Sequence, residues 1–167
     1  MSGDVKKRCA VSHPKHYNSR PDELECIDIV RHYVFNIGCA VKYLWRAGLK
    51  TEEGMVESEK EIEDLEKAVW YINDELYRGI DLDEFAGMER VSDPNLDILL
   101  LEMSGHTFDL IANSEYYGGN IASAMKSLLC VGLVKDGRVY RTKAAVLKLR
   151  QAIKAIQARI RELEHYK

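Results

Sequence analysis

The sequence predicts an all-α protein, a helical bundle built from two tandem three-helix units related by pseudo-two-fold symmetry. Two observations carry this prediction. Apolar residues recur every three or four positions through several segments, which is the spacing of a helix with one buried face. The apolar pattern of residues 23–79 then returns in residues 96–167, displaced by a constant 84 positions. Because each unit must cover its apolar face, we expect the two units to pack against each other within one chain.

The first unit follows an irregular segment, residues 1–22, in which Pro14 and Pro21 interrupt helical geometry. Glycines stand at Gly48 and Gly79, where helices typically end. Between these signals the apolar stripes predict three helices, at about residues 23–33, 36–47 and 58–77.

The second unit follows an acidic segment, residues 80–95, which we interpret as a linker. Its first helix is expected over about residues 96–114, and the Asp136-Gly137 turn signal predicts a short hairpin near 133–141. Residue types recur at the 84-residue offset: Asn36 with Asn120, Gly48 with Gly132, Leu65 with Leu149, Ala68 with Ala152, and Ile72 with Ile156. One register kept through helices and loops indicates a tandem duplication.

Composition and charge argue against several classes of protein. The formal net charge of -3 and the lack of a basic tail give no reason to expect nucleic-acid binding. No apolar run approaches the roughly 20 residues that cross a bilayer, and no apolar stretch of a secretory signal follows the charged start. The four cysteines form no Cys-x-x-Cys pair. We therefore expect a cytoplasmic protein with reduced thiols.

The polar residues of the two units differ, and the difference locates a candidate site. In the first unit carboxylates occur in pairs three positions apart, which places each pair on one helix face: Glu25 with Asp28, and Glu61 with Asp64. In the second unit the counterparts of the last three are Ala112, Ala145 and Lys148. We interpret the second unit as a degenerate copy and expect the catalytic carboxylates in the first.

Four converging carboxylates need neutralisation, because two like charges 4 Å apart repel by about 4 kcal/mol at an effective dielectric near 20. A Mg²⁺ ion bound by all four would supply it and would typically hold phosphates. Salt bridges to Lys42, Arg46 and Lys67 would supply it as well. Lys42 and Arg46 lie one turn apart and opposite the apolar stripe, so that they also suit a phosphate group. Lys42 is the one of these cations retained in the second unit, as Lys126.

Further candidates lie in the N-terminal segment, where His13, His16 and Tyr17 flank Pro14. His16 and Tyr17 could contact a nucleotide base or sugar, or Tyr17 could simply pack the segment onto the bundle. The two tryptophans, Trp45 and Trp70, are expected in the core or at an interface. No Gly-x-x-x-x-Gly-Lys-Ser/Thr motif is present, which excludes a Walker-type phosphate loop.

A set of motifs in the first unit resembles a small tailed-phage domain family, long of unknown function, to which a phage nucleotide kinase belongs. The motifs are His16-Tyr17, Glu25-Cys26-Ile27-Asp28, Asn36, Lys42-Tyr43, Arg46-Ala47-Gly48-Leu49-Lys50, Asp64-Leu65, Lys67-Ala68 and Tyr71. The resemblance covers about residues 13–77. It implies a phage protein of the host cytoplasm, a homo-oligomer, and phosphoryl transfer to deoxynucleoside monophosphates. It also adds Asn36, Lys50 and Tyr71 to the expected substrate-binding residues.

The paired carboxylates are similar, more weakly, to those of the all-α nucleoside triphosphate pyrophosphatases (MazG-like), which hold Mg²⁺. We expect a nucleotide-handling protein, with phosphoryl transfer to (deoxy)nucleoside monophosphates first. The alternatives are Mg²⁺-dependent pyrophosphate hydrolysis, nucleotide binding without chemistry, as in a counter-defence protein, and a structural module with salt-bridged carboxylates.

Overall fold

The computed structural model describes residues 14, 17, 25–49, 53–78, 89–91, 117–135, 137–141 and 144–165. Its helices are α1 (Cys26–Val30), α2 (Phe35–Arg46), α3 (Glu57–Arg78), α6 (Gly119–Leu128) and α7 (Ala145–His165). Its strands are β1 (Glu89–Val91), β2 (Val131–Lys135) and β3 (Arg138–Arg141). The fold is mostly helical and belongs to the all-α class, as the sequence predicts.

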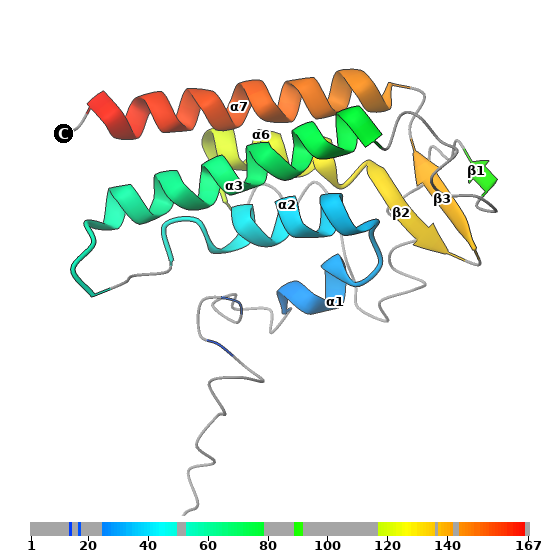
Figure 1. Cartoon of the computed structure of the whole chain (residues 1–167), viewed down its shortest axis with the longest axis horizontal. Helices are drawn as coiled ribbons and strands as arrows, with labels where there is room; N and C mark the ends of the chain where they lie inside the picture. Colours follow the sequence, from blue (N-terminus) through cyan, green and yellow to red (C-terminus); the bar gives the residue numbers. More distant parts are fainter. Residues whose placement is uncertain are drawn as a thin grey trace, which may run out of the picture.

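Two long helices form the centre of the bundle. α3 and α7 lie side by side along the long axis of the molecule (Figure 1), α2 packs on α3, and α6 packs on α7. Two acidic residues in the first turn of α3, Glu57 and Glu59, favour its start through the helix dipole. The bundle therefore consists of two helical hairpins joined through α3 and α7.

The core contains the apolar stripes of both units at the expected offset. Positions 84 residues apart are buried together: Ala40 with Ala124, Leu44 with Leu128, Leu65 with Leu149, Ala68 with Ala152, and Ile72 with Ile156. Burying one leucine or isoleucine side chain contributes roughly 1.5–3 kcal/mol, whereas an exposed ion pair contributes about 0–1 kcal/mol. The stripes thus provide the main stabilisation of the bundle. Trp45 belongs to this core, as expected.

The first helix is shorter than predicted. α1 covers Cys26–Val30, whereas the sequence predicted a helix over residues 23–33. Tyr33 instead pairs in antiparallel fashion with Leu133, at the edge of β2. Backbone bonding confirms the pairing, since the nitrogen of Val134 donates to the carbonyl of His32 at 2.7 Å. This non-local pairing needs an extended backbone, and it ends the helix early.

The hairpin predicted near 133–141 is present as β2 and β3, and it begins two residues earlier than expected. β2 pairs with β3 in antiparallel fashion, while β1 pairs with β3 in parallel fashion, in the order β1-β3-β2. β1 lies within residues 80–95, which we interpreted as a linker. Its pairing depends on β3, almost fifty residues away, so that the local sequence does not reveal it.

Two reciprocal contacts relate the halves of the molecule. Tyr33 Oη donates to the carbonyl oxygen of Leu129 at 2.8 Å. The ring centroid of Tyr117 lies 5.7 Å from that of Trp45. Tyr117 and Leu129 are the counterparts of Tyr33 and Trp45 at the 84-residue offset, so the same two positions meet twice with the units exchanged. The contacts support pseudo-two-fold symmetry, while the common origin of the halves stays a prediction.

The helix expected over residues 96–114 lies outside the described residues. Among the helices that the structure describes, none combines the length and the apolar character needed to cross a membrane.

Candidate functional site

A cationic and aromatic face lies on α2 and α3, centred on the ring of Tyr43. Lys42 Nζ lies 4.9 Å from the ring centroid and Arg46 Cζ lies 4.7 Å from it. Lys67 Nζ reaches the same ring from α3, at 5.8 Å. The electron-rich face of an aromatic ring attracts cations, and here it gathers three of them. We call these four residues, with Tyr71, the α2–α3 face.

Tyr71 extends the aromatic part of this face. Its ring stacks on Tyr43, with a centroid distance of 5.8 Å and an interplanar angle of 19°. Phe35 and Trp70 meet Tyr71 edge-on, at 6.0 Å and 5.0 Å. Phe35 is 73% exposed and Trp70 is 61% exposed, so Trp70 does not belong to the core. Aromatic surface therefore reaches solvent on α2 and α3, beside the cations.

The Tyr71 phenol is neutral at physiological pH. Partial burial, followed by the neighbouring Cys39 and Tyr43, raises its pKa above the ordinary value. Burial likewise raises the pKa of the Cys39 thiol, although Lys42 opposes the shift. Neither group therefore supplies an anion to the α2–α3 face.

Arg46 connects two other predicted site residues, Asp64 and Tyr17. Its Nε and Nη2 donate to the two carboxylate oxygens of Asp64, at 3.0 Å and 2.7 Å. Its Nη1 donates to the hydroxyl of Tyr17 at 3.1 Å, which holds Tyr17 against α2. Burial lowers the pKa of Arg46, but the hydrogen bonds to Asp64 and Tyr17 outweigh it and the net shift is upward. Asp64 is 1% exposed and is neutralised by a salt bridge.

Lys67 forms an ion pair with Glu63, which also accepts from Lys60. The hydrogen bonds from Lys67 and then Lys60 lower the pKa of Glu63 to about 2. Glu63 was not among the predicted site residues. Its charge partly offsets the cation that α3 brings to Tyr43.

The other predicted carboxylates do not converge on Asp64. Asp28 accepts the backbone N–H of Glu25 at 3.2 Å, within a capping box at the start of α1. Asp28 also accepts from Arg31 at 3.3 Å. Glu61 pairs with Arg159 of α7 at 2.9 Å. The expected four-carboxylate cluster is therefore not present, because a backbone N–H and Arg31 reach Asp28, Arg159 reaches Glu61, and Arg46 reaches Asp64.

Over the described stretches of the chain, no group of three or more His, Cys, Asp or Glu side chains could hold a metal ion.

The remaining predicted site residues do not lie on the α2–α3 face as the structure describes it. Asn36 bonds across to α3, where its Nδ2 donates to Asp74 at 3.0 Å and to Glu75 at 3.3 Å. This contact fixes the start of α2 against α3. His16 and Lys50 lie outside the described residues.

The structure thus brings together Tyr17, Lys42, Arg46, Asp64, Lys67 and Tyr71 from the predicted set. The central residue, Tyr43, was part of the Lys-Tyr motif but received no role. A signal for it existed, because Tyr43 lies three positions before Arg46 and next to Lys42, away from the fully buried stripe. The Tyr43 ring holds the three cations together. The spacing of the residues alone shows only that Lys42 and Arg46 share a helix face.

A family of proteins of unknown function, DUF3310, matches residues 11–73. The matched segment includes α1, α2 and most of α3, and therefore the whole α2–α3 face. No curated protein and no solved structure matches the chain. The similarity thus concerns the first unit and ends before α6 and α7.

Proposed function

We propose that the α2–α3 face binds a nucleotide and that the protein transfers a phosphoryl group to a nucleoside monophosphate. The observation that carries the proposal is the gathering of Lys42, Arg46 and Lys67 around the Tyr43 ring. The cations suit phosphate oxygens, and the exposed rings of Phe35 and Trp70 suit a stacked base.

Phosphoryl transfer is compatible with such a face. Its transition state spreads negative charge over the phosphoryl oxygens, and catalysis depends mainly on positioning and on electrostatic stabilisation. Lys42 and Lys67 would stabilise that charge. Arg46 would act mainly as a positioning residue, because Asp64 already occupies two of its donors. The motifs of residues 13–77 resemble a small tailed-phage domain family to which a phage nucleotide kinase belongs, and this resemblance favours the same reaction.

The described carboxylates do not fit a protein-bound Mg²⁺ ion. Asp64 and Glu61 are each paired with an arginine, and Asp28 accepts from Arg31. Any Mg²⁺ requirement would therefore come with the phosphates of the nucleotide. For the same reason no observation favours the alternative of pyrophosphate hydrolysis by a metal-activated water.

A homo-oligomer in the cytoplasm of a phage-infected host remains part of the proposal. An aromatic side chain outside the proposed stacking rings, Tyr77 on α3, is 81% exposed. Such residues are enriched at protein interfaces. Light scattering coupled to gel filtration would give the mass of the particle, and a monomer would remove this part.

The test is an incubation with ATP and a panel of deoxynucleoside monophosphates, with Mg²⁺ or with EDTA. Transfer predicts a diphosphate product and ADP, whereas pyrophosphate release would indicate the hydrolase. Lys42→Ala should lower turnover by at least about tenfold, because it removes a charge-assisted phosphate contact. Arg161→Ala, an exposed cation on α7, is the matched control and should leave turnover unchanged. If no nucleotide is converted, both enzymatic proposals fail.

Nucleotide binding without chemistry is the second candidate. Two of the predicted catalytic carboxylates, Asp64 and Glu61, already accept hydrogen bonds from arginines. Because these contacts occupy the carboxylates, they favour binding without chemistry. Saturable nucleotide binding that Lys42→Ala weakens, with no product in the panel, would support this candidate over the kinase.

A further inference from the structure

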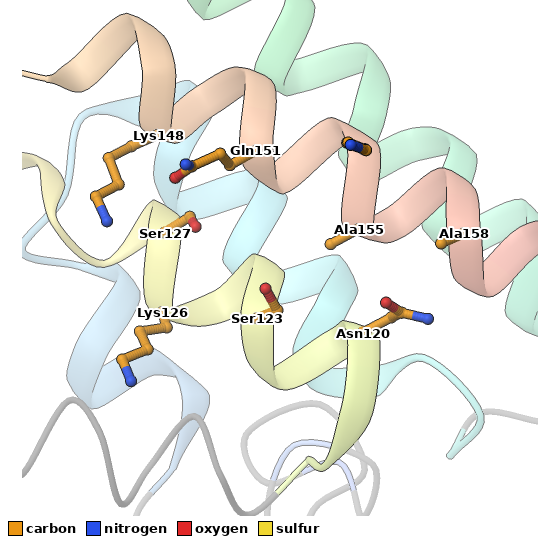
Figure 2. Close-up of a pocket in the computed structure, with 9 residues that line it drawn as sticks. Asn120, Ser123, Lys126, Ser127, Lys148, Gln151, Ala155 and Ala158 are labelled. Carbon is orange, nitrogen blue, oxygen red and sulfur yellow. The ribbon is translucent and has the colours of Figure 1, made fainter.

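A groove between α6 and α7 occupies the place in the second unit that the α2–α3 face occupies in the first. Its volume is about 480 Å³, within the roughly 300–1,000 Å³ of small-molecule sites. Figure 2 shows side chains from both helices around it, with Lys126 and Lys148 toward one end and Asn120 and Ala158 toward the other. Every lining residue lies 84 positions after a residue on α2 or α3.

The groove is open because aromatic residues are missing from it. Ser127 stands where α2 carries Tyr43, and Ala155 stands where α3 carries Tyr71. In the first unit the two rings stack and fill this position. The second unit keeps the helix pair but leaves a cavity between its helices.

The groove is also strongly positive. Lys148 replaces the buried Asp64, Lys126 corresponds to Lys42, and Lys154 adds a third ammonium group. None of the lining residues is a carboxylate. Within the part of the chain that the structure describes, no ion pair neutralises any of these three lysines.

An acidic side chain at one end of the groove, Glu162, already has hydrogen-bond partners. At the Asn120 end, Glu162 accepts from Asn120 Nδ2 at 2.7 Å and from Arg159 at 3.3 Å. Three like charges around one cavity repel each other, and a bound anion relieves that repulsion.

We propose that this groove is a second binding site, which takes a small molecule through an oligophosphate group. Lysines bind phosphate oxygens as point charges, while the hydroxyl of Ser127 and the amide of Gln151 can donate further hydrogen bonds. No aromatic residue lines the groove, so it has no stacking surface for a base. The site recognises the phosphates and is indifferent to the base, which distinguishes it from the α2–α3 face.

The test is calorimetric titration of the full chain with inorganic tripolyphosphate at low ionic strength. Ala155→Tyr restores the first-unit residue and should fill the groove, while Lys148→Gln with Lys154→Gln removes two charges. Each change should weaken binding by at least about tenfold, because the tyrosine ring would occupy the groove and the lysine changes remove charge-assisted hydrogen bonds to phosphate. Arg150→Gln, an exposed cation of α7 outside the groove, is the matched control and should alter binding less than about twofold.

The same titrations in a Lys42→Ala background separate this site from the proposed nucleotide site. Tripolyphosphate binding should persist there, and ATP should bind the groove no more tightly than tripolyphosphate does. Circular dichroism verifies that the groove variants fold. The proposal is overturned if tripolyphosphate shows no saturable binding, if Ala155→Tyr or the double lysine variant binds as the wild type does, or if a single-stranded oligonucleotide binds the groove more tightly.

Discussion

The ion pair between Arg46 and Asp64 has the geometry of a structural contact. Both side chains are largely buried, with 12% and 1% of their surfaces exposed, and two hydrogen bonds join them. Removing one partner of a buried pair leaves the other charge uncompensated, which costs about 3–5 kcal/mol. We therefore expect Asp64→Asn to lower the free energy of unfolding by about 3 kcal/mol, as measured by urea denaturation.

A paired substitution separates this explanation from a catalytic role of Asp64. Replacing both charges, with Arg46→Met and Asp64→Leu, should recover most of the lost stability, because apolar side chains often substitute for a buried pair without penalty. An Asp64→Asn protein as stable as the wild type would contradict the structural role.

The ion pairs of Glu63 should make the stability of the fold depend on pH. Its pKa falls from an ordinary value of 4.5 to about 2, through Lys67 and then Lys60, so its charged form is favoured in the folded state. The resulting stability is complete above pH 4.5 and disappears as the pH falls toward 2. Glu63→Gln should thus destabilise the protein at pH 7 and have little effect near pH 2. Glu63 is about a third exposed, which limits the effect to about 1 kcal/mol. Thermal unfolding across this pH range measures it, and a pH-independent difference would contradict the assignment.

At the scale of single residues, spacing predicted which side chains share a helix face but not which partner each one finds. Lys42 and Arg46 do lie together, one turn apart. Whether Asp64 would meet a metal or Arg46 was left open, because the answer depends on the distance between α2 and α3. Tyr43 was missed partly for the same reason, since one of the three cations around its ring, Lys67, lies on another helix.

Among the elements, the irregularity near the start of β2, between Val131 and Leu133, depends on one glycine. Gly132 has φ +82°, and a Cβ there would lie 2.6 Å from Cγ2 of Val34. We expect Gly132→Ala to destabilise the fold by about 2–4 kcal/mol, from backbone strain together with overpacking. Gly137→Ala is a matched control, because Gly137 has φ +72° but open space around its Cα. In chemical denaturation, Gly132→Ala should have a lower free energy of unfolding than Gly137→Ala. Equal losses of stability would show that the contact with Val34 contributes nothing.

Helices α2 and α3 were predicted to within one residue at each end, because apolar periodicity and terminal glycines determine them locally. The prediction was poorest for elements set by distant pairing. α1 ends early where Tyr33 joins Leu133, and β1 exists through its contact with β3. Such contacts bring together residues far apart in the sequence, which no local pattern records.

For the whole molecule, one scaffold carries two different surfaces. The buried stripes match at the 84-residue offset, whereas the polar positions diverge. In the sequence alone, that divergence indicates decay of the second unit. The geometry adds another reading, because replacing two rings by Ser127 and Ala155 creates a cavity that the first unit lacks.

The pair of Glu61 and Arg159 connects the halves, since it joins α3 to α7. The side chain of Glu61 is 12% exposed and that of Arg159 is 33% exposed, which is intermediate between a surface pair and a buried one. Losing it should cost about 1–2 kcal/mol, between the values for those two classes. We expect Glu61→Gln to lower the free energy of unfolding by this amount and to leave nucleotide affinity and turnover unchanged.

Denaturation and nucleotide titration on the same preparation distinguish the structural role of Glu61 from the catalytic role that its spacing suggested. Glu164→Gln, an exposed carboxylate on α7, should change neither quantity and controls for the loss of charge. If Glu61→Gln abolished turnover at unchanged stability, Glu61 would return to the catalytic set. If it lowered stability alone, the carboxylate would serve to hold the two units in register, and the α2–α3 face would have to act without it.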